Sequence, residues 1–183
     1  MGSQAHAVLI LFAMIGGFLC GAFCVVFLLL KLIKRKHPQV IIYFVMMIMC
    51  ILIVAASWIL NIGWLRVILI LLAVPFIHPV IFTVINAMAI PNVIYSARLK
   101  VYTLITDITY VLMYAFFPDG GDTGPMYVFF GLIKNDSAVH VLSIFSAVSL
   151  IVYIIFTTLQ VIETIETKKR VTAQNLWHTA NLV

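Results

Sequence analysis

Two ionisable side chains lie in stretches that are otherwise apolar, and they have the clearest potential for chemistry. Asp107 lies in TLITDITYVL and His78 lies in VPFIHPV. A carboxyl group and an imidazole in contact can exchange a proton, because histidine titrates near neutral pH. A charged group at the centre of a bilayer costs about 2.5–3.5 kcal/mol on insertion scales, so we expect Asp107 to face other helices rather than lipid.

The order of the apolar stretches predicts that these two side chains meet. Counted along consecutive antiparallel helices, Asp107 and His78 both fall near mid-membrane, and we expect contact directly or through water. As a functional pair they would gate a pathway or couple proton movement. As a structural clasp they would fix helix register, with about 0.6 kcal/mol per such bond on average. Thr103, Tyr110 and Tyr114 lie at helical spacing from Asp107 and would extend a polar strip. We favour the clasp, because the other membrane segments read as nearly all apolar.

The motifs of the common membrane enzymes are missing from the sequence. Intramembrane proteolysis takes paired aspartates, a serine with a histidine, or a zinc site such as H-E-x-x-H, and only one aspartate lies in an apolar stretch. Asp119 and Asp122 in PDGGDTGP are turn residues, and two carboxylates do not complete the oxygen shell of a calcium ion. We therefore expect no enzymatic activity, no cofactor and no metal.

Composition determines the class of protein that must position these residues. The 183 residues are 64% hydrophobic and 9% charged, whereas soluble domains are about 45–50% apolar and about 25% charged. Helices of about 20 apolar residues cross the ~30 Å hydrocarbon layer. The sequence predicts an all-α integral membrane protein, a bundle of about five transmembrane helices in residues 1–161. The expected spans are 7–30, 40–60, 67–89, 101–117 and 141–161, with an outer loop at 118–140 and a tail at 162–183.

Basic residues predict the orientation of the bundle. If every expected span crosses, only Arg66 and Lys134 of the 11 Lys and Arg residues fall on one side. Cytoplasmic loops carry an excess of Lys and Arg. This predicts an N-terminus outside and a C-terminus in the cytoplasm, in a bacterial inner membrane. The basic residues flank the membrane, which favours contact with lipid headgroups and not direct binding of nucleic acid.

Two features of the expected spans could serve packing or function. Ala13, Gly17 and Gly21 recur every four residues, which lets two helix backbones approach closely within one chain or between copies. We expect a homo-oligomer. Pro75 and Pro79 predict a kink or break near the middle of the third span. Interrupted helices mark sites in transporters, although proline kinks are also common in ordinary bundles.

The two ends of the bundle carry the remaining candidate residues. In the outer loop, Asp119 and Asp122 are followed by Phe129 and Phe130, which we expect at headgroup depth or in the mouth of the bundle. The tail is largely uncharged after Arg170, and tryptophan is enriched at binding hot spots. It predicts either a docking peptide for a cytoplasmic protein or another copy, or a segment lying on the inner leaflet. Its apolar residues are Val171, Leu176, Trp177 and Leu182.

Two functions fit these observations. The favoured one is a non-enzymatic polytopic membrane subunit that anchors a cytoplasmic partner through its C-terminal tail and senses or relays events at the outer face. Small membrane proteins of bacterial defence and bacteriocin-immunity modules share this size and layout, an analogy with no shared motif. The alternative is a small channel or proton-coupled transporter that uses Asp107 and His78.

Overall fold

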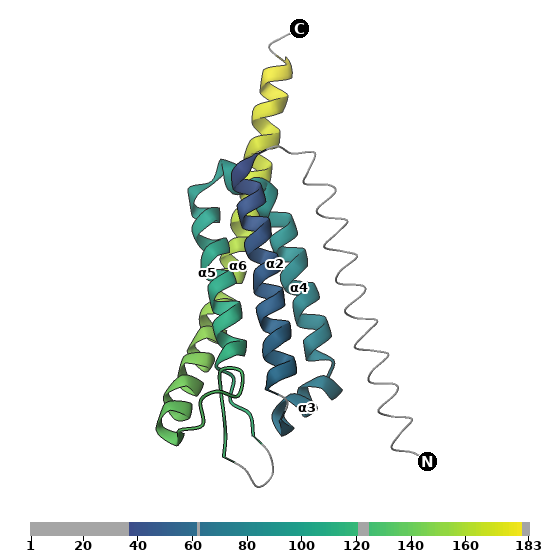
Figure 1. The fold of residues 1–183 in the computed structure, drawn as a ribbon. Coiled ribbons are helices and arrows are strands. Elements are labelled where there is room, and N and C mark those ends of the chain that lie inside the picture. Colours follow the sequence, from purple (N-terminus) through teal and green to yellow (C-terminus); the bar gives the residue numbers. More distant parts are fainter. Residues whose placement is uncertain (1–36, 62, 121–124, 181–183) are drawn as a thin grey trace, which may run out of the picture. The chain divides into compact units, whose positions relative to one another are not determined.

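A computed structural model describes residues 37–61, 63–120 and 125–180, with side chains described as far as residue 177. This part of the chain is helical apart from its connections, as Figure 1 shows. An all-α fold is therefore confirmed for these residues. The expected span at 7–30, with Ala13, Gly17 and Gly21, lies outside them. In chain order the elements are α2 (Pro38–Leu60), α3 (Trp64–Leu71), α4 (Val74–Ala89), the 3₁₀ helix η1 (Ile90–Tyr95), α5 (Ala97–Ala115) and α6 (Asp136–Ala180).

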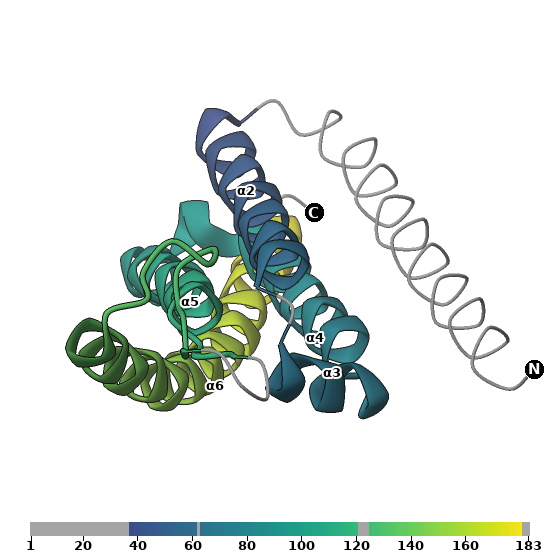
Figure 2. The same ribbon diagram turned by 60° about the horizontal axis from the view of Figure 1, so that its bottom comes forward.

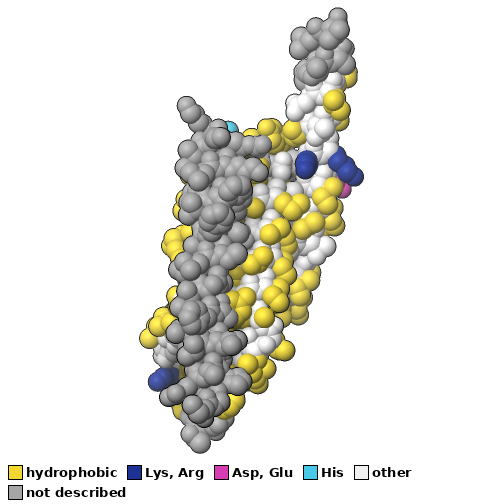
Figure 3. Space-filling model, turned by 90° about the vertical axis from the view of Figure 1, so that its right-hand side faces the viewer, with side chains coloured by type: hydrophobic (Ala, Val, Ile, Leu, Met, Phe, Trp, Pro, Cys, Tyr) yellow, Lys and Arg dark blue, Asp and Glu magenta, His cyan; other side chains and the backbone are white. Residues whose placement is uncertain are grey.

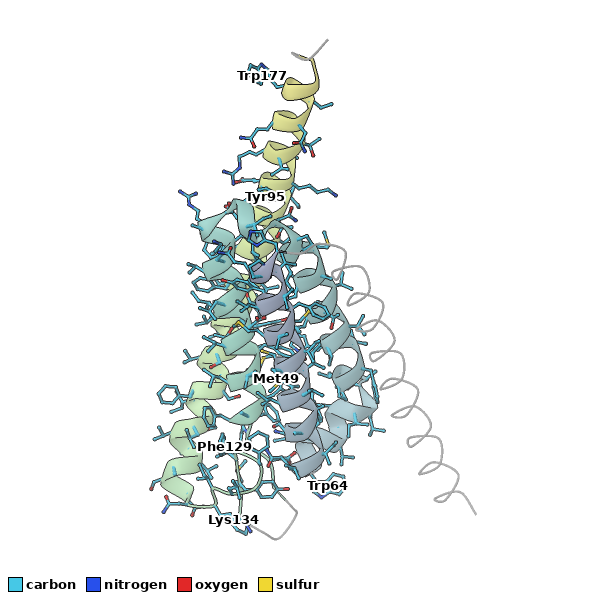
Figure 4. The ribbon with its side chains drawn as sticks, turned by 45° about the horizontal axis from the view of Figure 1, so that its top comes forward. Met49, Trp64, Tyr95, Phe129, Lys134 and Trp177 are labelled. Carbon is cyan, nitrogen blue, oxygen red and sulfur yellow. The ribbon has the colours of Figure 1, made fainter. Side chains whose placement is uncertain are left out.

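Three stretches of these described helices are long and apolar enough to cross a membrane: Pro38–Leu60, Val74–Tyr95 and Asp136–Trp177. The chain is therefore a multi-pass membrane protein. In the described part of the face drawn in Figure 3, hydrophobic side chains cover the middle and basic side chains lie toward the two ends. Trp64 and Tyr95 lie near opposite ends of the bundle (Figure 4) and are 55% and 54% exposed, as aromatic residues at membrane interfaces are.

α5 is the exception among the long helices. It is present near the expected span at 101–117, but it is not among the stretches apolar enough to cross a membrane by composition. Its polar residues are on the buried side, including Thr103, Thr106 and Asp107, whereas Leu104 and Ile108 are partly exposed. A helix of this pattern buries its polar face against neighbouring helices, because polar groups that face lipid would have no hydrogen-bond partners.

The third expected span is divided, but closer to its start than the kink or break that Pro75 and Pro79 predicted near its middle. α3 ends at Leu71, Ala73 has φ of 58° in the left-handed region, and α4 begins at Val74. Pro75 lies in the first turn of α4, where its missing N–H costs no hydrogen bond. Pro79 lies inside α4 without ending it. The break is therefore before Pro75 and near one end of the bundle, not at mid-membrane, and α3 lies across the end of α4 (Figure 2).

The predicted fifth span and tail form one helix. α6 runs for 45 residues from Asp136 to Ala180, which at 1.5 Å per residue is about 68 Å. It packs along α5, as Figures 1 and 2 both show. We call the end of the bundle where α6 begins the loop end, and the end from which its last turns project the tail end.

α2 and α5 are held together by three hydrogen bonds at a seven-residue spacing. In each, a side chain of α2 donates to a backbone carbonyl of α5, and the two residues are 57 positions apart in the chain. A spacing of seven keeps one face of each helix on the other, as in a parallel coiled coil. The pairs are Tyr43 Oη to Lys100 O at 3.3 Å, Cys50 Sγ to Asp107 O at 3.7 Å, and Ser57 Oγ to Tyr114 O at 2.8 Å.

A buried ion pair closes the loop end. Arg66 and Asp119 are both fully buried, with Nε and Oδ2 3.6 Å apart. The carboxylate of Asp119 accepts the backbone N–H groups of Gly63, Leu65 and Arg66, which have no partner within the helix because they lie at the start of α3. A Cβ atom at Gly63 would overlap this carboxylate, so glycine is required there. The ion pair thus fixes α3 to the loop between α5 and α6.

The guanidinium of Arg66 also reaches the three hydrogen bonds between α2 and α5, which we call the ladder between these helices. It donates to the carbonyl and hydroxyl oxygens of Ser57 and, over 2.9 Å, to the carbonyl of Tyr114. Burial lowers the pKa of Arg66 to about 10, against the opposing effect of Asp119, so the group stays charged at neutral pH. One arginine therefore links α2, α3, α5 and the loop.

The described remainder of the α5–α6 loop, from residue 125 onward, folds back on its own start. Asp119 pairs with Tyr127 and Val128 pairs with Ile133 as antiparallel bridges, and Val128 is fully buried. The expected outer-loop residues Phe129 and Phe130 form the turn with positive φ angles of 51° and 60°. Asp122 lies outside the described residues.

Removing one member of the ion pair should destabilise the bundle. In Asp119→Ala, the buried charge of Arg66 loses its counter-ion and three backbone donors lose their acceptor. We expect a loss of about 3–5 kcal/mol in the free energy of unfolding, measured by denaturant titration in detergent micelles. The exposed Lys134→Ala on the same loop is the matched control and should change it by less than about 0.5 kcal/mol. Similar small effects for both variants would contradict a structural role of the ion pair.

Candidate functional site

One face of α6 is polar along most of its packed length. Its residues recur three or four positions apart and therefore lie on one side of the helix. All but Thr157 of them are at most 6% exposed. At the loop end, Ser146 Oγ donates to the carbonyl of Met113 at 2.7 Å, which shows that this face meets α5. The residues of this face are Ser146, Ser149, Tyr153, Thr157, Gln160, Thr164 and Thr167.

α5 presents a matching polar face. Thr103, Asp107, Tyr110 and Tyr114 follow each other at three or four residues and are each at most 6% exposed. This confirms that the polar strip around Asp107 lies inside the bundle. The expectation that the remaining interior is nearly all apolar is wrong, because α6 contributes a second polar strip along the first.

Near the loop end, His78 joins a cluster of tyrosines. Its Nδ1 lies 2.6 Å from the hydroxyl of Tyr114, a hydrogen-bond distance. Its ring also meets the rings of Tyr110 and Tyr153 edge-on, with centroids 5.3 and 5.1 Å apart. Tyr110 stacks on Phe82 of α4 at 3.9 Å. This aromatic cluster joins α4, α5 and α6.

The contact predicted between His78 and Asp107, directly or through water, is not made by a direct hydrogen bond, because the carboxylate of Asp107 has no hydrogen-bond partner among the described residues. His78 is bonded to Tyr114, which is two helical turns, or about 10 Å, farther along α5 than Asp107. The predicted depth counted from Val67, but α4 begins only at Val74, so His78 lies one turn inside its helix and closer to the loop end. The break before α4 is therefore the physical reason for the error.

Asp107 lies on the tail side of this aromatic cluster, and its carboxylate has no hydrogen-bond partner within the described chain. It is 1% exposed. Its backbone carbonyl accepts the Cys50 thiol. The neighbouring hydroxyl groups of Tyr110 and Tyr153 also lack partners among the described residues.

Gln160 forms the next layer toward the tail end. Its side-chain amide donates to Asn86 Oδ1 at 3.1 Å and to Thr103 Oγ1 at 3.2 Å. All three residues are fully buried. Gln160 therefore joins α4, α5 and α6 in the half of the bundle where the sequence predicted no central contact.

The tail end carries a fourth layer around Glu163. Its carboxylate accepts the hydroxyl of Ser96 at 2.7 Å and the guanidinium of Arg170 at 2.9 Å. Ser96 also caps α5 by accepting the N–H of Leu99. Glu163 is 6% exposed, whereas the side chain of Arg170 is 62% exposed. This layer joins the buried column to the basic cluster of the tail.

Four layers follow one another from the loop end to the tail end: the His78 cluster, Asp107 with its neighbouring hydroxyl groups, the Gln160 layer and the Glu163 layer. Together with the Arg66–Asp119 pair they form a column of buried polar groups from one end of the bundle to the other. Such a column can hold water, a cation or a proton, or it can fix helix register. Sequence reasoning missed Gln160, Glu163 and Arg66 as members. A signal was available for Gln160, because it continues the Ser146–Ser149–Tyr153 spacing.

A recess at the loop end is a second feature of α6. It is lined by Pro118 and Met126 of the loop and by Asp136, Val139, His140 and Ser143 of the first turns of α6. In the part of the chain that is described, no group of three or more His, Cys, Asp or Glu residues could hold a metal ion.

The predicted tail residues are divided between two faces of α6. Leu176 and Trp177 are 67% and 66% exposed and, with Ala173 three and four positions earlier, form one stripe. Val171 lies five residues before Leu176 and so falls on a different face. Leu182 lies outside the described residues.

Comparison with known proteins adds no assignment: no family model, no curated protein and no solved structure matches this chain.

The Gln160 layer should contribute measurably to stability. In Gln160→Leu, Asn86 and Thr103 lose their donor, and we expect the free energy of unfolding to fall by about 1–3 kcal/mol. A double-mutant cycle with Thr103→Val should give a coupling energy of about 0.6 kcal/mol. Thr158→Val, an exposed neighbour that bonds only to its own helix, is the control partner and should be additive with Gln160→Leu. Equal coupling for both partners would argue against this layer.

Proposed function

We propose that this chain is a non-enzymatic membrane subunit that anchors a cytoplasmic protein on the projecting end of α6 and relays events from the opposite face. The observation that carries the proposal is the continuity of α6, a single helix of 45 residues. Its first turns line the loop-end recess, its middle carries the polar face, and its last turns expose Leu176 and Trp177. A rigid helix with these three parts can transmit a shift at one end to the other.

The proposed orientation has the loop end outside and the tail end in the cytoplasm. Figure 1 shows that α5 begins and α6 ends at the tail end, and these segments carry five basic residues: Arg98, Lys100, Lys168, Lys169 and Arg170. At the loop end, Arg66 is buried against Asp119, so Lys134 is the exposed basic residue among those described there. The positive-inside rule favours this orientation.

The direction of α6 favours a protein partner over the inner leaflet. The helix continues without interruption past the last buried residue, Thr167, and projects beyond the other helices (Figure 1). Trp177 (Figure 4) is ten residues farther, about 15 Å along the axis. A helix that leaves the bundle along its own axis carries this stripe away from the membrane surface rather than along it.

The chemistry of the stripe suggests what the partner offers. Ala173, Leu176 and Trp177 present an apolar ridge of the kind that a helix inserts into a hydrophobic groove. Lys168, Lys169 and Arg170 precede it by one turn. We therefore propose a partner with an apolar groove and an acidic rim, which a basic cluster would steer into place.

A second candidate function is a small channel or proton-coupled transporter. The buried polar column favours it, because polar and ionisable groups inside a membrane bundle commonly mark ion or proton pathways. In this version Asp107 is the central group, and His78 acts with Tyr114 nearer the loop end.

The anchoring function predicts that the stripe is needed to retain a partner. The full chain, purified from its native host in mild detergent, should carry a stoichiometric soluble protein. The double substitution Leu176→Glu with Trp177→Glu should reduce recovery of that protein by at least about tenfold, as expected when hot-spot residues are lost. Bound proteins are identified and quantified by mass spectrometry.

Two variants control for the tail experiment. Gln174→Ala changes an exposed residue beside the stripe without changing its charge and should leave recovery unchanged. A chain ending after Arg170 keeps the Glu163 layer intact, and it should lose the partner while the bundle stays folded. Recovery of the same partner with the shortened chain would overturn the anchoring proposal.

The transport function predicts proton uptake into liposomes that contain the purified chain. Asp107→Asn cannot exchange a proton, so it should abolish uptake as followed with an enclosed pH-sensitive dye. Thr158→Val should leave uptake at the level of the unaltered chain. Absence of uptake by the unaltered chain, or equal uptake by Asp107→Asn, would rule this candidate out.

A further inference from the structure

The middle of the polar column contains oxygen atoms that no donor satisfies. Among the described residues of α5 and α6, the buried side-chain atoms without a hydrogen-bond partner are all oxygens. Asp107, Tyr110 and Gln160, which supply four of them, are at most 1% exposed. The atoms are Thr106 Oγ1, Asp107 Oδ1 and Oδ2, Tyr110 Oη, Tyr153 Oη, Thr157 Oγ1 and Gln160 Oε1.

The register of α5 against α6 places most of these oxygens at one level. The bond from Ser146 to Met113 lies on the loop-end side of Asp107, and the bond from Gln160 to Thr103 lies on its tail-end side. Midway between these contacts, Tyr153 lies opposite the turn that contains Asp107. The rings of Tyr110 and Tyr153 are 5.8 Å apart. Tyr153 and Thr157 are one turn apart on the same face of α6.

The amide nitrogen of Gln160 is hydrogen-bonded, whereas its amide oxygen is not. Its nitrogen is held by Asn86 and Thr103, both on the tail side of Asp107. Its oxygen is therefore left as an acceptor without a donor. A buried acceptor in this state costs about 1–3 kcal/mol unless something else satisfies it.

We propose that these oxygens form a binding site for one monovalent cation, Na⁺, with Asp107 as the charged ligand and the hydroxyl and amide oxygens of Tyr110, Tyr153, Thr157 and Gln160 as neutral ligands. This goes beyond both functions proposed above, because binding requires neither a docked partner nor transport. It assigns a ligand to the middle of the column, whereas the Glu163 carboxylate on the tail side is bonded to Ser96 and Arg170, and His78 on the loop side is bonded to Tyr114.

Charge and ligand type select the class of cation. One carboxylate balances one positive charge, and hard cations take oxygen ligands. Calcium sites commonly use several carboxylates, and the described residues hold no cluster of three or more acidic, histidine or cysteine side chains. The hydroxyl groups of Tyr110, Tyr153 and Thr157 carry protons of their own, but none of these oxygens has a hydrogen-bond partner among the described residues. A small cation contacts several of them together.

The test is whether Na⁺ stabilises the purified full chain. In detergent at constant ionic strength, replacing choline with Na⁺ should raise the melting temperature in a saturable way, because a ligand that binds the folded state stabilises it by mass action. Asp107→Asn should abolish the rise. Thr157→Val removes one neutral ligand and should raise the half-saturating Na⁺ concentration roughly tenfold.

Thr158→Val is the matched control for Thr157→Val, because Thr158 is exposed and bonds to Ile154 of its own helix. It should bind Na⁺ like the unaltered chain. The proposal is overturned if Na⁺ and choline give the same melting temperature, or if the Na⁺ effect is the same in Thr157→Val and Thr158→Val. If Asp107→Asn does not fold, the Thr157 and Thr158 pair still decides the question.

Discussion

Everything in this bundle depends on the need to enclose α5. The helix carries Thr103, Thr106, Asp107 and Thr109 on its buried side, and a bilayer offers no water to satisfy such groups. α2 covers one side of α5 and bonds to its carbonyls, while α6 covers another with a polar face of its own. The helices around α5 therefore turn their apolar sides toward lipid, and the interior of the protein is more polar than its lipid-facing surface.

The polar groups at the two ends of the interior are bonded to other groups of the protein, whereas those at its middle lack hydrogen-bond partners among the described residues. An ion pair between Arg66 and Asp119 lies at the loop end, and one between Glu163 and Arg170 lies at the tail end. Gln160 adds a hydrogen-bonded link between three helices. Groups whose partners are all within the protein define one register and resist rearrangement. The level of Asp107 has no such partners, so it is the place where a ligand or a proton could change the energy of the bundle.

The sequence predicted the helices better than their contacts. The apolar runs of α2 and α6 are long, so their identity as helices was clear, and Asp107 had to be buried because lipid is the only other environment. The position of His78 relative to Asp107 was predicted wrongly, because the depth of His78 depends on the left-handed conformation of Ala73, which no glycine marks. The role of Asp119 was hidden in the same way, since PDGGDTGP resembles any exposed turn. Gln160 was predictable from its spacing and was missed.

The ladder between α2 and α5 has a consequence for how this sequence can vary. Its three acceptors are backbone carbonyls, and every residue type has one. The donor positions Tyr43, Cys50 and Ser57 are thus restricted to side chains with a hydroxyl or thiol, while the ladder places no demand on the side chains of Lys100, Asp107 or Tyr114. Among related chains, positions 43, 50 and 57 should exchange only among donors. A carboxylate retained at position 107 would then reflect selection on the carboxylate itself and not on helix pairing.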